Sequence, residues 1–435
     1  MKIFLDNLGC DKNRVDGEKL LARLIASGFE QAFTAAEADL VIVNTCGFIQ
    51  PAKEESIETI LDHASHTKVA VTGCLSERYL DTLQKELTEA VVVAGLSDKE
   101  ATYKTLIDTL SPQQPTLPAP PSLTRALTGP VHSAPLKISE GCDNRCSYCA
   151  IPLIRGSFVP RSEQDILSEA RLLRKKGVQE LLVVGQDITA YGKRKGLPAL
   201  LRKLTRLSPA FHWIRLMYCH PLGVTDELIE VMTSESRILP YLDLPLQHYT
   251  DKLLKRMNRH YTGKEAAALI RKLRKRVPSI ALRTTLLLGF PGETETDFRN
   301  LYSFVKDTEF DRLGVFAFSP EEETQAFGFK NRVASSTVKK RMDRLMELQN
   351  DILYRQNLAK VGSIQEVLID GAEGDVWIGR TRHDAPEVDC RVVVRNCKLV
   401  PGRFYKLKIT DADTYDLFVH GYSHSIVPGG LFVTS

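Results

Sequence analysis

The sequence predicts an α/β protein with an amino-terminal parallel α/β domain, a central partial (β/α)6 barrel and a small all-β domain at the carboxyl end. Strand-like and helix-like segments alternate on both sides of a proline-rich stretch, which implies parallel sheets with right-handed crossovers. After Gly362 the pattern changes to short alternating strands broken by Gly, Pro and Asp. We therefore expect domains over 1–110, 136–360 and 361–435, joined by a linker over 111–135.

The first domain has four apolar segments that we expect to be strands, namely 2–8, 39–45, 68–73 and 90–95. The segment 39–45 is almost continuously apolar, as is typical of a parallel strand buried on both faces. Helices are expected between the strands. We expect Asp16 to cap the first helix and Gly28 to end it, with later helices opened by Pro51 and Ser76.

Seven prolines predict the linker, because proline lacks an amide donor and disrupts helices and central strands. They are Pro112, Pro115, Pro118, Pro120, Pro121, Pro130 and Pro135. The barrel strands are expected at 136–140, 180–185, 212–218, 241–246, 281–289 and 312–318. In such barrels the reactive site lies at the carboxyl ends of the strands. A long amphipathic helix is expected from about residue 336 to 359, before the β domain.

Composition and charge exclude several classes. The net charge of +4 over 435 residues points to neither nucleic acid nor a membrane surface. No apolar run approaches the roughly 20 residues needed to span a bilayer, and charged residues appear too early for a signal peptide. We therefore expect a cytoplasmic protein. Its odd number of cysteines, nine, argues against a disulfide framework and for metal or redox chemistry.

The strongest chemical signal is the spacing C-x3-C-x2-C formed by Cys142, Cys146 and Cys149 directly after the first barrel strand. Thiolates this close need a cation or a cluster to offset their charge. A structural zinc site needs a fourth protein ligand, which would have to be distant in sequence. A 4Fe-4S cluster on three thiolates instead leaves one iron open to bind another molecule.

Three more cysteines follow successive strands of the first domain: Cys10, Cys46 and Cys74. The carboxyl ends of neighbouring parallel strands meet at one edge of a sheet, so these thiols should converge there. This pattern favours a second cluster with one open iron. The alternative is three buried structural cysteines, which is the role we expect for Cys219, Cys390 and Cys397.

The motif Cys142–Cys149, with Tyr148 before the last cysteine, resembles the radical S-adenosylmethionine (SAM) superfamily. The resemblance implies that the open iron chelates the amino and carboxylate groups of SAM, and that one electron then releases a 5′-deoxyadenosyl radical. It places Tyr148 near the adenine, although core packing would equally explain an aromatic residue there.

The same resemblance assigns cofactor contacts at two other strand ends. Gly185 and Gln186 follow the second barrel strand, where the family holds the methionine end of SAM. The turn after the fifth strand supplies Gly289, Pro291, Gly292 and Glu293, whose glycines allow close approach of the backbone to a ligand. A turn without a ligand would explain the same residues. His248, after the fourth strand, faces the cavity or forms part of its wall.

The contexts Asn7-Leu8-Gly9-Cys10, Asn44-Thr45-Cys46-Gly47 and Thr72-Gly73-Cys74 resemble the methylthiotransferases, and the β domain resembles a TRAM domain. Together these resemblances cover essentially the whole chain. They imply two 4Fe-4S clusters and the insertion of a methylthio group into an unactivated C–H bond, with one SAM as methyl donor and a second as radical source. A reductant such as flavodoxin or ferredoxin, and a sulfur donor, are implied as partners.

Two branches of that family compete as models for the substrate. One modifies an aspartate of small-subunit ribosomal protein S-twelve (RimO-like), and the other a tRNA adenosine (MiaB-like). Residues 361–435 have 8 Lys/Arg against 10 Asp/Glu, a net charge of −2, and an RNA-binding module should be basic. An acidic module suits a basic ribosomal protein.

Local sequence also resembles the RimO-like branch. The matching segments are Glu140–Asn144 and the acidic segment Asp384–Asp389. Cys390 and Glu323 depart from the pattern, since glycine is usual at both positions. An alternative of another class is a non-catalytic iron–sulfur electron carrier or scaffold, but ferredoxin-type carriers use four cysteines per cluster.

Overall fold

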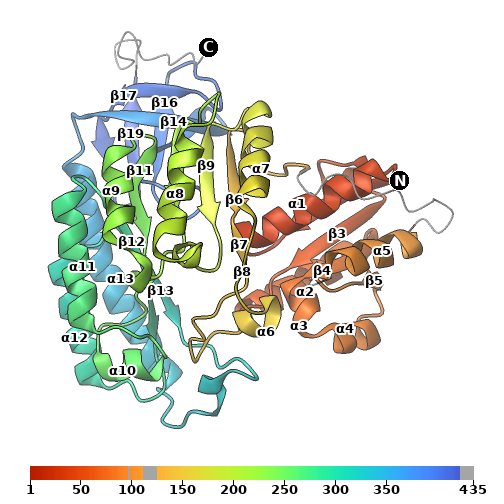
Figure 1. Ribbon diagram of the computed structural model, residues 1–435, viewed down its shortest axis with the longest axis horizontal. Coiled ribbons are helices and arrows are strands. Elements are labelled where there is room, and N and C mark those ends of the chain that lie inside the picture. The colour runs from red at the N-terminus through yellow and green to blue at the C-terminus, as the bar shows by residue number, and fades with distance from the viewer. Residues whose placement is uncertain (97, 111–124, 422–435) are drawn as a thin grey trace.

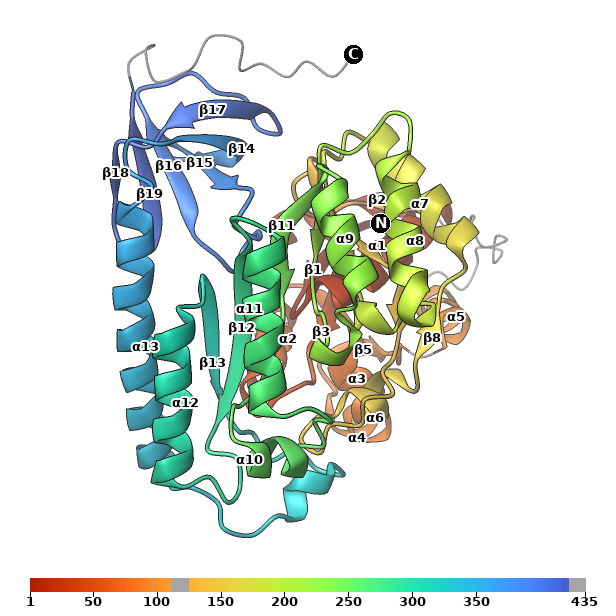
Figure 2. The same ribbon diagram turned by 60° about the vertical axis from the view of Figure 1, so that its left-hand side comes forward.

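The protein is an α/β molecule with a parallel sheet in each of its first two parts and a small β sheet at its carboxyl end, as predicted. The computed structural model describes residues 1–96, 98–110 and 125–421. In Figure 1 the amino-terminal domain lies to one side of the central domain. Figure 2 shows the β domain at the far end of the long helix α13, away from α10. Within the described residues, no helix combines the length and apolar character needed to cross a bilayer.

The amino-terminal sheet has the strand order β2-β1-β3-β4-β5, with all pairs parallel. Its strands are β1 (Lys2–Asn7), β2 (Glu30–Gln31), β3 (Leu40–Thr45), β4 (Lys68–Gly73) and β5 (Ala90–Val93). Its helices are α1 (Asp11–Ala26), η1 (Ala35–Glu37), α2 (Gln50–Ala64), α3 (Cys74–Arg78), α4 (Leu80–Glu86) and α5 (Lys99–Leu110). Leu40 and Ile42 pack with α1 and α5, whereas Val41 and Val43 pack on the opposite face. Burial on both faces explains why β3 begins with four consecutive apolar residues, Leu40 to Val43.

Two predicted helix starts were wrong. Helix α1 begins at Asp11 with Cys10 at its N-cap, so Asp16 lies inside the helix instead of capping it. The Asp16 carboxylate is held by Lys137 and Arg155 of the central domain, which leaves it unavailable as a cap. The helix expected from Ser76 begins at Cys74 and is broken at Tyr79 into α3 and α4.

The central sheet contains six parallel strands in the order β13-β12-β11-β10-β9-β6. They are β6 (Ser133–Lys137), β9 (Glu180–Val184), β10 (Trp213–Leu216), β11 (Ile238–Asp243), β12 (Ala281–Leu288) and β13 (Arg312–Ala317), with a separate hairpin of β7 (Ser139–Glu140) and β8 (Val159–Pro160). The helical segments are α6 (Ile151–Arg155), α7 (Glu163–Lys175), η2 (Ile188–Ala190), α8 (Lys193–Thr205), η3 (Pro221–Gly223), α9 (Asp226–Ser234), α10 (Asp251–Arg256), α11 (Gly263–Arg276), α12 (Glu295–Thr308), η4 (Gln325–Gly328) and α13 (Ser335–Leu358). Apolar side chains of these helices and of one sheet face form the largest core.

The predicted linker is wrong at its carboxyl end. Strand β6 begins at Ser133 and includes Pro135, which is tolerated because β6 pairs on one side only, with β9. Arg125 is fully buried between Glu18 and Glu169, so this part of the segment packs between the domains. The prolines from 112 to 121 lie outside the described residues.

The carboxyl-terminal sheet has the order β17-β14-β15-β16-β19-β18. Its strands are β14 (Ile364–Glu373), β15 (Val376–Thr381), β16 (Arg391–Arg395), β17 (Phe404–Lys408), β18 (Asp411–Ala412) and β19 (Asp416–His420). Leu368, Ala385 and Phe404 pack against barrel strands. Buried Arg380 also pairs with Glu180, the first residue of β9, so the sheet of this domain covers the amino-terminal end of the barrel.

Candidate active site

The first thiol group lies at the carboxyl edge of the amino-terminal sheet. Cys10 follows β1, Cys46 follows β3 and Cys74 follows β4, and these three strands are neighbours. The backbone of Gly9 has a φ of +84°, and a Cβ there would lie 3.0 Å from the Cys46 Sγ. A side chain at position 9 would therefore separate the two loops. The structure brings these three predicted ligands to one edge.

Asn13 ties the loops of this edge together. Its Nδ2 donates hydrogen bonds to the backbone oxygens of Leu8 (2.9 Å), Asn44 (3.2 Å) and Thr45 (3.1 Å). A Cβ on Gly47 would lie 2.7 Å from the Leu75 Cα, so this loop also needs glycine. The thiols are thus positioned by a rigid backbone, as a preorganised ligand set requires.

Burial raises the pKa of the Cys74 thiol to about 11, although the Arg155 guanidinium acts in the opposite direction and the neighbouring Cys10 and Cys46 add to the increase. Burial likewise raises the pKa of Cys46. Thiols with such pKa values stay protonated near neutral pH unless a metal replaces the proton. The feature that fits an iron–sulfur cluster is the gathering of three thiols at one edge of the sheet on a rigid backbone.

The second thiol group occupies the loop between β7 and α6. Cys149 donates its backbone N–H to the Cys146 oxygen (3.0 Å), and Cys142 donates to the Gly156 oxygen (3.2 Å). Gly141 has a φ of +68°, and a Cβ there would overlap the Ser157 backbone. Burial, and then the charge of Cys146, raise the pKa of Cys149 to about 12. These three half-buried thiols lie within one short loop, which fits the donor set of a cluster.

Within the described residues, no three Cys, His, Asp or Glu side chains converge on a point suited to a single metal ion. Each thiolate of a three-cysteine cluster binds a different iron atom, so its ligands need not converge in that way. Of the remaining cysteines, Cys219 and Cys390 are buried as expected, and Cys397 is half-buried beside Trp377.

Arg155 connects the two thiol groups. It ends α6, which begins two residues after Cys149. Its Nη2 lies 3.0 Å from both the Cys74 Sγ and the Asn13 Oδ1, and its Nη1 pairs with Asp16. The segment that follows one thiol group is thereby bonded to a thiol of the other. Sequence reasoning missed Arg155, for which closeness to Cys149 was the available signal.

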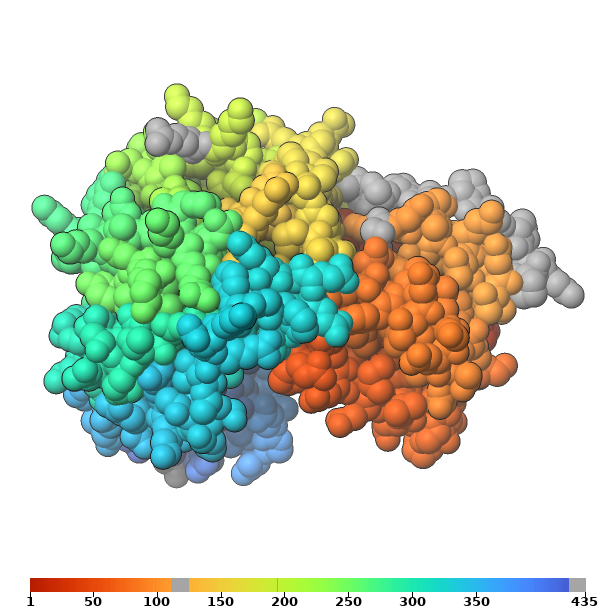
Figure 3. All heavy atoms as spheres, turned by 90° about the horizontal axis from the view of Figure 1, so that it is seen from below, coloured from red at the N-terminus to blue at the C-terminus, as the bar shows by residue number. Residues whose placement is uncertain are grey.

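A second bridge closes the site from below. Glu321 is buried and accepts from Arg78 (2.7 Å) and Lys53 (3.0 Å) of the amino-terminal domain, and Tyr79 donates to Glu322 (3.2 Å). In Figure 3 the cyan segment that contains these glutamates reaches across to the orange amino-terminal domain. The two domains are thus bonded to each other at two separate places, Arg155 and Glu321.

The predicted SAM contacts lie around the carboxyl ends of the barrel strands. The Tyr148 ring meets Phe290 edge to face, with centroids 6.5 Å apart. Gln186 donates its Nε2 to Glu140 (3.1 Å), while its Oε1 and the hydroxyl of Ser139 are buried without a hydrogen-bond partner in the structure. Gly185 leaves room for Ser139, because a Cβ there would lie 2.7 Å from that hydroxyl. Unpartnered buried polar atoms fit a polar ligand such as SAM.

The turn after β12 is stabilised by the side chain of Glu293, which lies within it. Glu293 accepts from the Gly289 N–H (2.8 Å) and pairs with Arg341 on α13, so its carboxylate shapes the turn. Gly292 has a φ of +89° and donates to the Asn331 oxygen (2.9 Å), directly after Pro291. His248 is fully buried, and burial lowers its pKa to about 4, so its ring is neutral near neutral pH.

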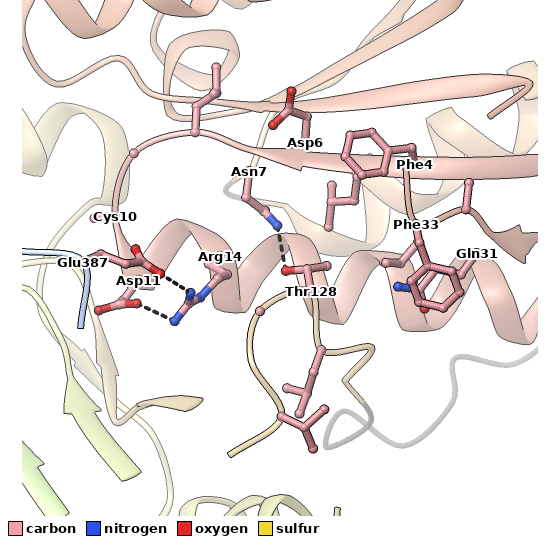
Figure 4. A pocket seen from close by; sticks show the side chains of 18 residues that line it. Phe4, Asp6, Asn7, Cys10, Asp11, Arg14, Gln31, Phe33, Thr128 and Glu387 are labelled. Atoms are coloured by element: carbon pink, nitrogen blue, oxygen red, sulfur yellow. Dashed lines mark hydrogen bonds and ion pairs between the residues drawn. The ribbon is translucent and has the colours of Figure 1, made fainter. Parts of the chain in front are cut away.

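Beside Cys10 lies a cavity of about 560 Å³. It is bounded by β1, the first turn of α1, residues 127–131 and Glu387 of the β domain. Figure 4 shows Arg14 between Asp11 and Glu387 near the Cys10 end, with ion-pair distances of 2.8 and 3.2 Å. Cys10 therefore belongs to the first thiol group and also lines this cavity.

The acidic segment of the β domain is not an acidic surface. Asp384 is buried and pairs with Arg312, and Asp389 lies 3.3 Å from Arg283 and accepts from the Tyr241 hydroxyl (2.7 Å). Only Glu387 of its three acids has a largely exposed side chain, at 71%. The two aspartates therefore add little negative charge to the surface of the β domain, because Arg312 and Arg283 neutralise them.

Family models match three stretches of the chain. Residues 136–305 match the radical SAM superfamily, residues 2–95 match the uncharacterized protein family UPF0004, and residues 361–420 match the TRAM domain. These stretches contain both thiol groups and the β domain.

Curated relatives are similar over nearly the whole chain. A protein of Caldanaerobacter subterraneus subsp. tengcongensis, named ribosomal protein uS12 methylthiotransferase RimO, is 42% identical, with 94% of this chain and 98% of the relative covered. Proteins of the same name from a Thermoanaerobacter species and from Geobacter sulfurreducens are 44% and 40% identical, covering 94% and 96% of this chain and 98% and 97% of the relatives.

Among solved structures, the radical S-adenosylmethionine methyltransferase TsrM from Kitasatospora setae is similar with a TM-score of 0.55 and 15% identity, over 86% of this chain and 79% of that one. The cobalamin-dependent S-adenosylmethionine radical enzyme OxsB is similar with a TM-score of 0.51 and 12% identity, over 80% and 56% of the two chains. At these identities the likeness shows the fold alone.

Proposed function

Because this chain belongs to the RimO family of ribosomal protein uS12 methylthiotransferases, we propose that it transfers a methylthio group to the β-carbon of an aspartate in uS12. It is an enzyme of the radical SAM methylthiotransferase type. The observation that carries the proposal is the pair of three-thiol groups, one at the edge of the amino-terminal sheet and one in the loop before α6, joined through Arg155.

The radical SAM family implies an iron–sulfur cluster and SAM, and the proposal adds a second cluster. Cys142, Cys146 and Cys149 would hold the cluster that binds SAM. Cys10, Cys46 and Cys74 would hold the other, in the two-cluster, three-thiol pattern expected from sequence. When bound, these groups supply the one-electron chemistry that breaks an unactivated C–H bond and the sulfur that is transferred.

The chain's own residues position and shield this chemistry. Arg155 and Arg259 place guanidinium groups 3.0 Å from the Cys74 Sγ and 3.5 Å from the Cys146 Sγ, where they offset negative charge on the ligands. Gln186 and Ser139 offer unpartnered polar atoms to SAM, and Tyr148 with Phe290 forms an aromatic wall. The bridge at Glu321 helps to exclude water from the space between the domains.

The proposed partners are uS12, alone or in the small ribosomal subunit, a reductant such as flavodoxin or ferredoxin, and a sulfur donor. Because the substrate is a ribosomal protein, the proposed location is the cytoplasm. The relatives that are similar over nearly the whole chain are named for uS12, which supports a protein substrate over the RNA of a tRNA adenosine methylthiotransferase.

The test is the reaction itself. Anaerobically reconstituted protein, SAM and reductant are incubated with uS12 or with unmodified tRNA, and products are analysed by mass spectrometry. We expect a methylthio group on an aspartate of uS12 and 5′-deoxyadenosine in solution. Modification of tRNA alone would replace the proposal with the tRNA function, and no 5′-deoxyadenosine would favour a non-catalytic electron carrier.

Cysteine variants test the ligand assignment in the same assay. Cys142→Ala and Cys10→Ala should each lower the bound iron by about one cluster, while Cys219→Ala, which changes a buried cysteine outside both groups, should leave it unchanged. Equal iron in the Cys10→Ala and parent proteins would contradict the second cluster.

A further inference from the structure

Lys12 is a buried cation without an acidic partner. Lys12 is 8% exposed, and among the described residues no carboxylate lies within ion-pair distance of its Nζ. The Nζ instead lies 3.1 Å from the centroid of the Tyr218 ring. A buried ammonium is costly unless an anion or several acceptors compensate its charge. Among the described residues, the groups that favour its charged form are Cys10, Tyr218 and Asp11, and the Asp11 carboxylate forms no ion pair with it, so the ammonium is available to an anion.

Neighbouring buried cations are already compensated. Lys137 pairs with Asp16 and, at 2.7 Å, with Glu140. Arg283 lies between Asp243 (3.5 Å) and Asp389 (3.3 Å).

Arg259 also lacks a carboxylate among the described residues, but its nitrogens donate to the Pro245 oxygen (2.7 Å), the Tyr261 hydroxyl (3.3 Å) and the Cys146 Sγ (3.5 Å). An ammonium has three donors, and the contact with one ring face leaves Lys12 able to bind an anion.

The position of Lys12 suits a substrate that must reach both thiol groups. Lys12 lies in the first turn of α1, two residues after Cys10. Tyr218 lies just beyond the carboxyl end of β10, where the barrel site is expected, and its φ of 61° is in the left-handed region. The Asp243 carboxylate accepts the Tyr218 N–H (3.0 Å) and helps to hold this costly conformation. The ring and the ammonium thus meet where the two domains join.

We propose that Lys12 binds the side-chain carboxylate of the substrate aspartate, with the Tyr218 ring beside it, and thereby selects aspartate as the target. This inference rests on the function proposed above. The carboxylate is attached directly to the β-carbon, so one ion pair fixes the reacting carbon to within a single bond. Asparagine has the same shape but no charge, and would leave the buried ammonium uncompensated.

The experiment compares two uS12 loop peptides that differ only by Asp or Asn at the target position. Their dissociation constants are measured on the reconstituted holoprotein by fluorescence anisotropy, for the parent, Lys12→Met, Lys12→Arg and Lys339→Met. Lys339 is the matched control, because it is an exposed lysine on α13 paired with Asp343. Iron content and the electron paramagnetic resonance spectra of the clusters are recorded for every variant.

We expect the parent and Lys339→Met to bind the Asp peptide about ten- to a hundredfold more tightly than the Asn peptide. In Lys12→Met this ratio should fall to near one, mainly through loss of Asp-peptide affinity, and Lys12→Arg should restore part of it. The yield of methylthio product should fall in Lys12→Met together with this ratio of dissociation constants, while the iron content of the variant equals that of the parent.

Other results overturn the inference. A Lys12→Met protein that keeps the parent ratio shows that Lys12 does not bind the carboxylate. Equal weakening of both peptides with altered cluster spectra shows that Lys12 supports the Cys10 site instead. If the parent neither binds nor modifies uS12 or the Asp peptide, the proposed function fails together with this inference. If the parent is active and Lys12→Met keeps the parent ratio of the two dissociation constants, only this inference fails.

Discussion

Replacing Arg155 with Gln removes the cation that the central domain presents to the thiols of the amino-terminal domain. The side chains of Arg155 and Asp16 are 3% and 2% exposed, so their ion pair is buried. Removing one partner of a buried pair costs about 3–5 kcal/mol. Asp16 keeps Lys137 and Lys99 as partners, so we expect a loss near the lower limit, about 3 kcal/mol.

The same substitution should change the electronic properties of the proposed amino-terminal cluster. Arg155 donates to the Cys74 Sγ at 3.0 Å, and donors to ligand sulfurs raise the reduction potential. A hydrogen bond to a charged group is worth about 1.5–3 kcal/mol, which converts to roughly 60–130 mV for one electron. We therefore expect Arg155→Gln to lower the midpoint potential by about that amount.

The measurement is a redox titration followed by electron paramagnetic resonance in a Cys142→Ala, Cys146→Ala, Cys149→Ala background. Urea unfolding of the same proteins gives the stability change. Arg161→Gln is the matched control, since Arg161 also pairs with a buried carboxylate, Glu169 (2.8 Å), but contacts no thiol. Equal potentials in Arg155→Gln and Arg161→Gln, with equal loss of stability, would refute the electronic role of Arg155 and leave it a structural residue.

Three further outcomes are expected. Burial alone would raise the pKa of Asp16, but Lys137, Lys99 and Arg155 outweigh it and hold this pKa well below its usual value. The contribution of Asp16 to the free energy of unfolding should therefore be complete above about pH 5 and lost as the pH falls below about 4. Urea unfolding of Asp16→Asn should show a loss at pH 7 that shrinks in acid, and a constant loss would contradict the ion pair. Glu321→Gln weakens the contacts with Arg78 and Lys53, so limited proteolysis should cut near residues 319–322 faster than in the control Glu323→Gln. In metal-free protein, burial raises the pKa of Cys74 to about 11. The rate at which a thiol reagent alkylates Cys74 should therefore be slow at pH 7 and rise about tenfold per pH unit. Fast alkylation at pH 7 would show an exposed thiolate.

The elements of the two parallel sheets were predictable because their signals are local. Continuous apolar runs such as Leu40–Thr45 mark strands buried on both faces, and their alternation with helices limits the topology. The short strand β2, with two residues, carries no such pattern and was missed. The start of α1 was misplaced because aspartate is a common capping residue, and the Asp16 partners Lys137 and Arg155 lie more than a hundred residues away in the sequence.

Charge counting failed where burial decided the outcome. The net charge of residues 361–435 is correct, but it does not tell which acids face solvent. Asp384 and Asp389 form ion pairs with Arg312 and Arg283 of barrel strands, and only the tertiary structure shows that pairing. The evidence for a protein substrate therefore comes from the relatives more than from an acidic surface.

By itself the sequence determined the fold class, the domain order and two groups of three cysteines, because spacing and strand ends follow from backbone geometry that every parallel sheet shares. Only the tertiary structure decided how the two groups face each other through Arg155, and that Lys12 meets Tyr218 without an acidic partner among the described residues. These contacts join residues from different domains. They depend on how packed surfaces fit together, and a one-dimensional pattern carries no information about that fit.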